Sequence, residues 1–169
     1  MERTRNTTAR QLNRGSLVIH SAPVALIRHV EWSVQSLLGE HLKLEWKVQP
    51  LVAGTYRTSI DWRDSIAVGA KLVSTLRGWH YLRFEVREES QESADLYRFT
   101  PDLGIHHASL DKSGSVVINE HQVVAALTRN FDEESIRKSL EDSLGKAWDL
   151  ELEPFRLVDQ HESPRLKAI

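Results

Sequence analysis

The sequence predicts an α+β protein with a ferredoxin-like βαββαβ core over residues 15–88, followed by an added β-hairpin and C-terminal helices. The first observation is that the hydrophobic period changes in the order strand, helix, strand, strand, helix, strand. The second is that 169 residues, 40% of them hydrophobic, suit one domain with a sizeable core. We therefore expect an antiparallel sheet in the strand order fourth, first, third, second, with both helices on one face. The first and third strands are expected to be parallel neighbours.

The first half of the core shows three kinds of pattern. Residues 16–20 form a short apolar run, typical of a buried strand, and Pro23 ends it. Apolar residues then recur on one face of a helix that Gly39 terminates. Residues 42–48 and 56–62 alternate strictly between apolar and polar side chains, which predicts two half-buried strands.

The second half of the core is a helix and a strand. The helix is predicted to begin at a cap formed by Asp64 or Ser65 and to end at Gly78. Residues 82–86 alternate again and are expected to form the fourth strand. The inward face of the helix is expected to consist of Ile66, Gly69, Ala70, Val73 and Leu76.

The remaining residues, 89–169, form the predicted extension of the same domain. Strands are expected at 96–99 and 105–110, with a tight turn from Asp111 to Gly114 that leads into 116–118. Asn119 with Gln122 is typical of a capping box that starts a helix through Arg129. A longer helix is expected over 132–150, and Pro154 and Pro164 indicate an irregular tail. At the other end, residues 1–14 lack a hydrophobic period and are expected to be a flexible arm.

Composition excludes several classes of protein. The absence of cysteine rules out disulfides, thiolate metal sites and cysteine nucleophiles. A net charge of −2 argues against a dedicated nucleic-acid-binding protein. No uncharged stretch approaches the roughly 18 apolar residues of a membrane span, so we expect a cytoplasmic protein. Neither a glycine-rich phosphate loop nor a metal-binding spacing is present, and no cofactor or metal is expected.

Basic residues gather on the predicted sheet face that points away from the helices. They are Lys43, Lys47, Arg57, Arg63, Arg83 and Arg87, and they outnumber Glu45, Asp61 and Glu85 on the same face. Arginine forks suit carboxylates and phosphates, so this face is a candidate docking surface for an acidic macromolecule. Exposed charges add little to stability. Replacing Arg57 and Arg83 by Glu is therefore expected to remove binding without unfolding the domain.

Trp32 stands apart from the other tryptophans. It lies opposite the apolar stripe of its predicted helix, beside Arg28 and Gln35. One interpretation is that the C-terminal extension covers it, which would leave Trp32 more than half buried. The other is that Trp32 is an exposed anchor for a partner, since tryptophan is enriched at binding hot spots.

Histidines offer a different type of site. His20 ends the first strand, just before the helix that carries His29 and Glu31, and either His106 or His107 could approach them. Two histidines and a carboxylate are a common zinc set, and histidine also serves acid–base chemistry. However, residues two apart on a helix do not face each other, and His106 and His107 point to opposite faces of a strand. A ligand pocket of His20, His29, Glu31 and His106 is thus an alternative hypothesis.

Six separated segments together resemble one family. They are IHSAP (19–23), HVEW (29–32), LRGW (76–79), LRFEV (82–86), LGIHHA (103–108) and LGKAW with ELEPFR (144–148 and 151–156). The family is an actinobacterial domain of unknown function, number 3145 in its series, and the resemblance covers about residues 15–158. It carries no established activity or catalytic residues. Its members lie near fatty-acid synthesis genes, which suggests an acyl carrier protein as a partner.

Two functional hypotheses result. The preferred one is a non-catalytic interaction or regulatory module that docks an acidic protein through Trp32 or through Arg57, Arg63, Arg83 and Arg87. The alternative is a small-molecule-binding protein or small enzyme with a pocket near His20 and His106. A concave pocket where the histidines meet a carboxylate would favour the alternative, and a flat patch would favour the interaction module.

Overall fold

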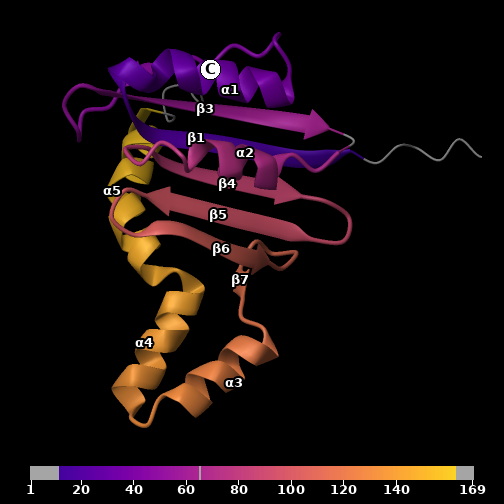
Figure 1. Cartoon of the computed structure of the whole chain (residues 1–169), viewed down its shortest axis with the longest axis vertical. Helices are drawn as coiled ribbons and strands as arrows, with labels where there is room; N and C mark the ends of the chain where they lie inside the picture. The colour runs from indigo at the N-terminus through magenta and orange to yellow at the C-terminus, as the bar shows by residue number, and fades with distance from the viewer. Residues whose placement is uncertain (1–11, 65, 163–169) are drawn as a thin grey trace, which may run out of the picture.

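The computed structural model describes residues 12–64 and 66–162, and this part of the chain has an α+β fold (Figure 1). One antiparallel sheet has the strand order β2-β3-β1-β4-β5-β6-β7. The strands are β1 (Asn13–Pro23), β2 (Lys47–Val48), β3 (Thr55–Asp64), β4 (Arg83–Glu89), β5 (Ala94–Thr100), β6 (Gly104–Leu110) and β7 (Val116–Val117). A 3-10 turn, η1 (Val24–Leu26), precedes the helices α1 (Ile27–Leu38), α2 (Gly69–Leu76), α3 (Glu120–Arg129), α4 (Glu133–Leu144) and α5 (Lys146–Glu162).

The core has the predicted order of elements and the predicted order of strands, β2-β3-β1-β4. The prediction that the first and third strands run parallel is wrong, because β1 pairs with both β3 and β4 in antiparallel register. The reason is topological. Each helical crossover skips one strand, so the strands that it joins are parallel but not neighbours.

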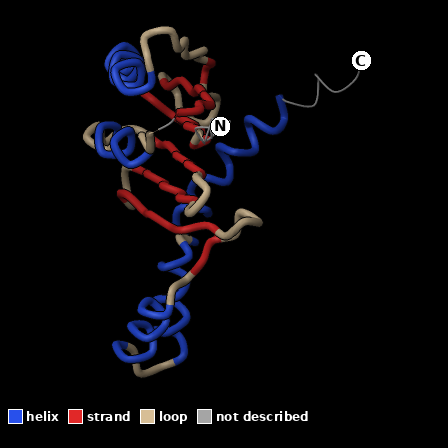
Figure 2. Tube along the Cα trace, turned by 90° about the vertical axis from the view of Figure 1, so that its right-hand side faces the viewer, coloured by secondary structure: helices blue, strands red, loops and turns tan. Residues whose placement is uncertain are grey.

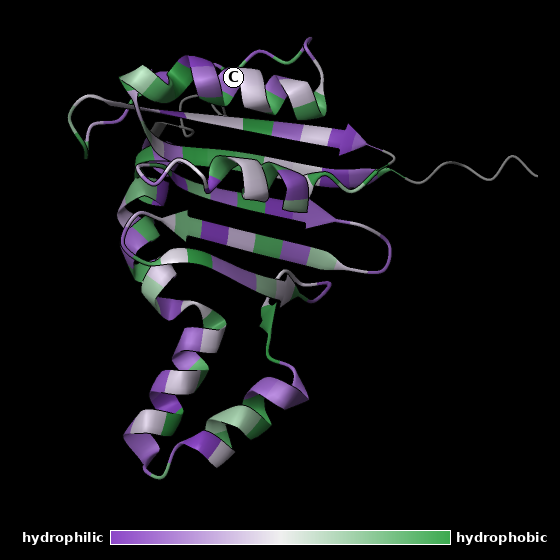
Figure 3. Ribbon diagram, viewed as in Figure 1, coloured by the Kyte–Doolittle hydropathy of each residue, from purple (hydrophilic) through white to green (hydrophobic). Residues whose placement is uncertain are grey.

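One face of the sheet packs against α1 and α2, and this is where the hydrophobic core lies (Figure 2). Alternate residues of β1 and β4 point into it, and Leu17, Ile19, Phe84 and Val86 are fully buried. Figure 3 shows the alternation as hydrophobic and hydrophilic bands along the strands. Gly15 is required next to Trp62, because a Cβ at this position would lie 2.0 Å from the indole.

The predicted second strand is much shorter in the structure. Only Lys47 and Val48 pair with β3, at the edge of the sheet. The alternation also shifts after Trp46: Val48 is exposed and Gln49 is buried, where its amide donates to the His20 carbonyl at 2.7 Å. A buried side-chain hydrogen bond has therefore replaced the expected periodicity.

The second helix begins later than predicted. Its first backbone amides, of Val68 and Gly69, donate to the Glu88 carboxylate at 2.9 and 3.0 Å. This cap comes from β4 rather than from Asp64, so the predicted cap is wrong, and Ile66 is exposed instead of buried. Ser65, the other predicted cap, lies outside the described residues.

The extension does not form a separate layer, because β5, β6 and β7 continue the same sheet. The predicted capping box is present: Asn119 accepts from the Gln122 amide, and the Gln122 side chain accepts from the Asn119 amide. At the N-terminus, β1 begins at Asn13, which shortens the predicted arm. The rest of that arm, residues 1–11, lies outside the described residues.

The long C-terminal helix predicted over 132–150 is two helices. Gly145, with φ of +75°, ends α4 in the left-handed conformation. The following helix, α5, then runs through Pro154, where an irregular tail was predicted, and Pro164 lies outside the described residues. Together α3 and α4 project from the sheet as an arm (Figures 1 and 2), and Phe131 between them is fully exposed.

The position of α5 also determines whether Trp32 is covered. Helix α5 lies on the sheet face opposite α1 and α2 (Figure 2). It therefore cannot cover α1, and the Trp32 side chain is 72% exposed. The prediction that the C-terminal extension buries Trp32 is wrong, and an exposed tryptophan on α1 remains.

Candidate functional site

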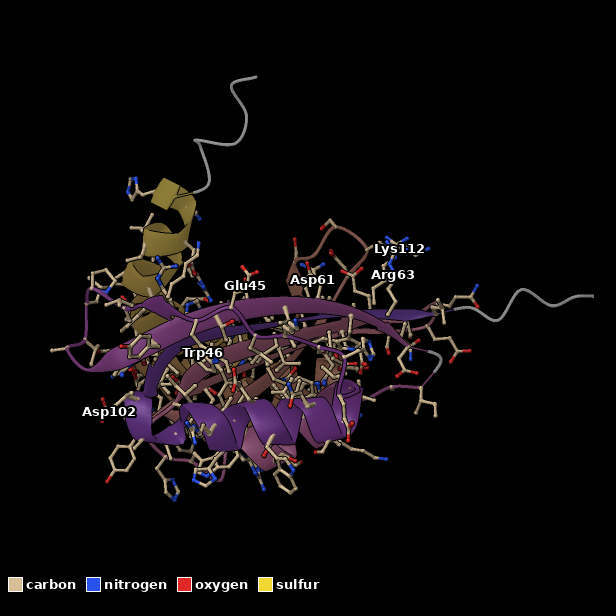
Figure 4. All side chains as sticks on the ribbon, turned by 90° about the horizontal axis from the view of Figure 1, so that it is seen from above. Glu45, Trp46, Asp61, Arg63, Asp102 and Lys112 are labelled. Atoms are coloured by element: carbon tan, nitrogen blue, oxygen red, sulfur yellow. The ribbon has the colours of Figure 1, made fainter. Side chains whose placement is uncertain are left out.

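The sheet face opposite the core carries six arginines, and we call it the arginine face. Strand alternation places them there, because their neighbours in sequence point into the core. Helix α5 crosses one end of the strands and leaves the other end open, which divides the face into a covered half and an open half (Figures 1 and 4). The six residues are Arg14, Arg57, Arg63, Arg83, Arg87 and Arg98.

In the covered half, carboxylates of α5 pair with the arginines of the strands. Asp149 lies 2.6 Å from Arg98, and Asp159 lies 2.6 Å from Arg57. Both arginines are almost completely buried. Buried charges of this kind are stable only when they are paired, so these contacts fix α5 on the sheet.

A third pair lies between those two. Glu151 accepts from Arg83 at 3.0 Å, and the Arg83 guanidinium also lies 5.2 Å from the centre of the Phe155 ring. Phe155 and Leu152 are buried against the sheet and fill the space between the ion pairs. The face of α5 that contacts the sheet therefore carries two kinds of side chain. Acidic side chains pair with the arginines, and apolar side chains pack between the ion pairs.

Glu85 is the centre of the covered half. Its carboxylate contacts His20 at 2.7 Å and accepts from Arg156 of α5, and Arg156 donates to Asp149 at 2.9 Å. Burial alone would raise the pKa of Glu85, but the hydrogen bonds from His20 and Arg156 outweigh it and lower the pKa to about 2. Glu85 is therefore ionised throughout the physiological range and acts as a structural anion.

His106 has a structural environment as well. Its ring lies 3.2 Å from an Arg98 nitrogen and 3.1 Å from the Ser143 carbonyl, and it packs against Trp148 of α5. Burial and the positive charge of Arg98 lower the pKa of His106. The neutral ring is thus held between β6 and the junction of α4 and α5.

The histidine pocket of the alternative hypothesis is not assembled. His20 and His106 are both on the arginine face beneath α5, whereas His29 is exposed on α1, beyond the opposite face. Glu31 on α1 accepts from the Trp46 indole at 2.9 Å. His107 points away from His106, as expected, and contacts Asp95 at 2.7 Å. Among the residues that the structure describes, no three histidines or carboxylates are grouped to hold a metal ion.

The open half contains a cavity of about 400 Å³. Six polar side chains line it. The backbone of Gly15 and Trp62 forms its floor, because these two positions face the core side of the sheet. Figure 4 shows Asp61 and Arg63 on the side of the sheet opposite α1, and Lys112 of the β6–β7 turn rises on that side. The polar lining consists of Arg14, Ser16, Asp61, Arg63, Arg87 and Glu89.

The arginines of this cavity differ from those under α5 in their pairing. Arg87 donates from Nε to Glu89 at 2.8 Å, and a Cβ at Gly114 would lie 3.3 Å from its guanidinium, so the hairpin turn closes this side. Arg14 and Arg63 are both exposed, and neither forms an ion pair with any residue in the described ranges. Two guanidinium groups are therefore available at one cavity.

The structure divides the residues of the predicted docking surface between the two halves. Arg57 and Arg83 are held by α5 and are not available to a partner, whereas Arg63 and Arg87 line the open cavity. Arg14 was missed, because it was assigned to the flexible arm. The signal that could have identified it is alternation: Arg14 continues the polar side of β1 through Ser16.

The fold and this face define an α+β protein whose antiparallel sheet is covered by helices on both sides, with an arginine cluster at the uncovered end. The chain belongs to the family described as "Protein of unknown function (DUF3145)", which matches residues 16–166. No curated protein and no solved structure matches the chain. In the described ranges, every helix is too short or too polar to cross a bilayer.

Proposed function

We propose that this protein is a non-catalytic interaction module of the cytoplasm that binds an acidic protein partner at the open half of its arginine face. The observation that carries the proposal is the contrast in pairing. Arg14 and Arg63 have no carboxylate partner within the described residues, although they share a face on which α5 supplies one to Arg57, Arg83 and Arg98.

The electrostatics of the cavity support an acidic ligand. Its lining holds three guanidinium groups and two carboxylates, and Glu89 is already occupied by Arg87. Lys112 adds a further positive charge at the neighbouring hairpin turn. Guanidinium forks bind carboxylates and phosphates with defined geometry, and exposed charges of this kind mainly increase association rate and specificity.

The binding of α5 in the covered half supports the same function. Helix α5 shows that this face binds a segment rich in Asp and Glu when it is part of the chain. A partner of the same chemistry is expected to bind the arginines that α5 does not reach. Proximity to fatty-acid synthesis genes, which the family resemblance implies, makes an acyl carrier protein the first candidate.

The test is a titration of purified acyl carrier protein by calorimetry at low and at physiological salt. Binding is expected at low salt and should weaken at higher salt, because charges at an exposed rim are screened over about 8 Å at physiological ionic strength. The double substitution R14E and R63E should abolish binding. R137E on the exposed surface of α4 is the matched control and should bind like the unmodified protein.

Two results would contradict the proposal. One is the absence of binding to this and to other acidic proteins at low salt. The other is binding that neither salt nor the double substitution at Arg14 and Arg63 affects. Thermal unfolding of each variant is measured alongside, so that a loss of binding is not confused with a loss of fold.

A further inference from the structure

We infer that the element bound at the open half is an amphipathic α-helix that crosses the strands beside α5 and presents one carboxylate per helical turn to Arg63, Arg14 and Arg87. This inference rests on the proposed function and specifies the partner's shape. It follows from the spacing of the arginines, the spacing of helical turns and the way in which α5 is already bound.

The spacing of strands nearly equals the rise of a helical turn. Neighbouring strands lie about 4.8 Å apart, and one turn of an α-helix advances about 5.4 Å. A helix laid across the strands therefore brings one residue per turn over each successive strand. On a sheet with one arginine per strand, carboxylates at positions i, i+4 and i+7 of such a helix meet three arginines in succession.

Helix α5 provides a direct check of this geometry. Asp149 pairs with Arg98 on β5, and Asp159 pairs with Arg57 on β3. These two carboxylates are ten residues apart, which is about 15 Å along a helix. The two arginines are three strand spacings apart in the order β3-β1-β4-β5, or about 14 Å. The two lengths agree across the whole span. Glu151, which pairs with Arg83 on β4, follows Asp149 by two residues, or about 3 Å, which is less than a full turn.

The open half has a similar series of arginines further along the strands. Arg63 is on β3, Arg14 on β1 and Arg87 on β4, which are three consecutive strands. Arg14 and Arg63 are direct register partners, and Arg87 lies opposite Ser16. From the first to the third of these strands is about 10 Å. Seven residues of a helix cover about the same length.

The distance from α5 also permits a second helix next to it. On β4, α5 pairs with Arg83 and Glu85, and Arg87 is two to four residues further along the strand. That is about 7–13 Å at the rise of a β-strand. Packed helices lie about 8–10 Å apart. A helix beside α5 would thus have its axis above the row that contains Arg87, Ser16 and Asp61.

The face also offers apolar contact between the arginines. Val18 on β1 and Leu96 on β5 point to the same side as Glu85 and Arg87, their register partners, and both are half-buried. In α5, the corresponding contacts are made by Leu152 and Phe155. The partner helix is therefore expected to be acidic and apolar on one face, not merely rich in carboxylates.

The experiment compares three synthetic peptides of 17 residues, the length of α5. The first has Glu at i, i+4 and i+7 and Leu at i+3 and i+8, so that one helical face is both acidic and apolar. The second has the same composition with Glu distributed around the helix. The third is the first peptide with a central proline, which breaks the helix. Binding to the full chain is measured by fluorescence anisotropy at low salt.

The first peptide is expected to bind at least tenfold more tightly than the other two and to gain helicity by circular dichroism on binding. R14E or R63E should each weaken it about tenfold or more, whereas R137E should not change it. Equal binding of all three peptides, still abolished by R14E and R63E, would overturn the helical inference and leave the proposed function intact. Binding of the first peptide that is insensitive to both variants would also overturn it. No binding of any peptide would count against the proposed function itself.

Discussion

The covered and open halves of the arginine face have similar side chains but opposite roles. On β3, Arg57 and Arg63 occupy the same face six residues apart. Arg57 is buried and pairs with Asp159 of α5, whereas Arg63 is exposed and lines a cavity. An arginine-rich sheet face is therefore not by itself a docking surface. Its role depends on whether the chain supplies its own acidic helix.

The largest effect is expected from removing α4 and α5 by truncation before Asp132. This uncovers Arg57, Arg98 and Glu85 and removes Leu152 and Phe155 from the sheet, so the covered half loses both its counter-charges and its apolar cover. The truncated chain should aggregate or elute as a heterogeneous species in size-exclusion chromatography. A monomer that still unfolds cooperatively would show that α5 is dispensable and that the two halves are alike.

A matched pair of substitutions compares the halves directly. R57E places a second carboxylate beside Asp159 in a buried site and should lower the free energy of unfolding by about 3–5 kcal/mol. R63E, on the same strand and face, should change it by no more than about 0.5 kcal/mol. Urea denaturation measures both. Equal effects of the two substitutions would mean that α5 does not hold Arg57 as described.

Stability below neutral pH should depend on the covered half through Glu85. Its pKa falls from 4.5 to about 2 on folding, chiefly because hydrogen bonds from His20 and Arg156 outweigh the effect of burial. The depressed pKa stabilises the fold fully above about pH 4.5, and this stabilisation is lost as the pH falls toward 2. The change amounts to about 3 kcal/mol.

This pH dependence is measured against the variant E85Q. The difference in unfolding free energy between the unmodified protein and E85Q should shrink as the pH is lowered from 6 toward 2. D61N is the control from the open half, because Asp61 is exposed and lies outside the network around Glu85. A difference that stays constant with pH would contradict the role assigned to Glu85.

The smallest effect is expected at Trp32, outside both halves. Because its side chain is 72% exposed, W32A should change the free energy of unfolding by no more than about 0.5 kcal/mol. Acrylamide quenching of tryptophan fluorescence should lose its most accessible component in the same variant. A stability loss of several kcal/mol would indicate that Trp32 is covered after all.

Local patterns in the sequence predicted the elements that depend on local interactions. The alternation of β3 and β4, the stripe of α1 and the capping box at Asn119 all involve residues a few positions apart, and each was confirmed. Errors arose where a distant residue intervened. Glu88 caps α2 from another strand, and Gln49 is buried by its bond to His20. The hydrophobic periodicity of a segment cannot predict such contacts, because the bonded residues are 20 and 29 positions apart in the sequence.

The same distinction governs the candidate site. The alternation of residues along the strands is enough to place arginines on one face of a sheet, because it sets the side to which Arg57, Arg63, Arg83 and Arg87 point. Which of these arginines pair with α5 depends on the three-dimensional path of the chain. The pairing of Arg57 with Asp159 spans 102 residues, and it requires α5 to continue through Pro154 and cross the sheet. That path depends on many contacts between α5 and side chains of several strands. These contacts join distant parts of the chain, so no local sequence pattern encodes them.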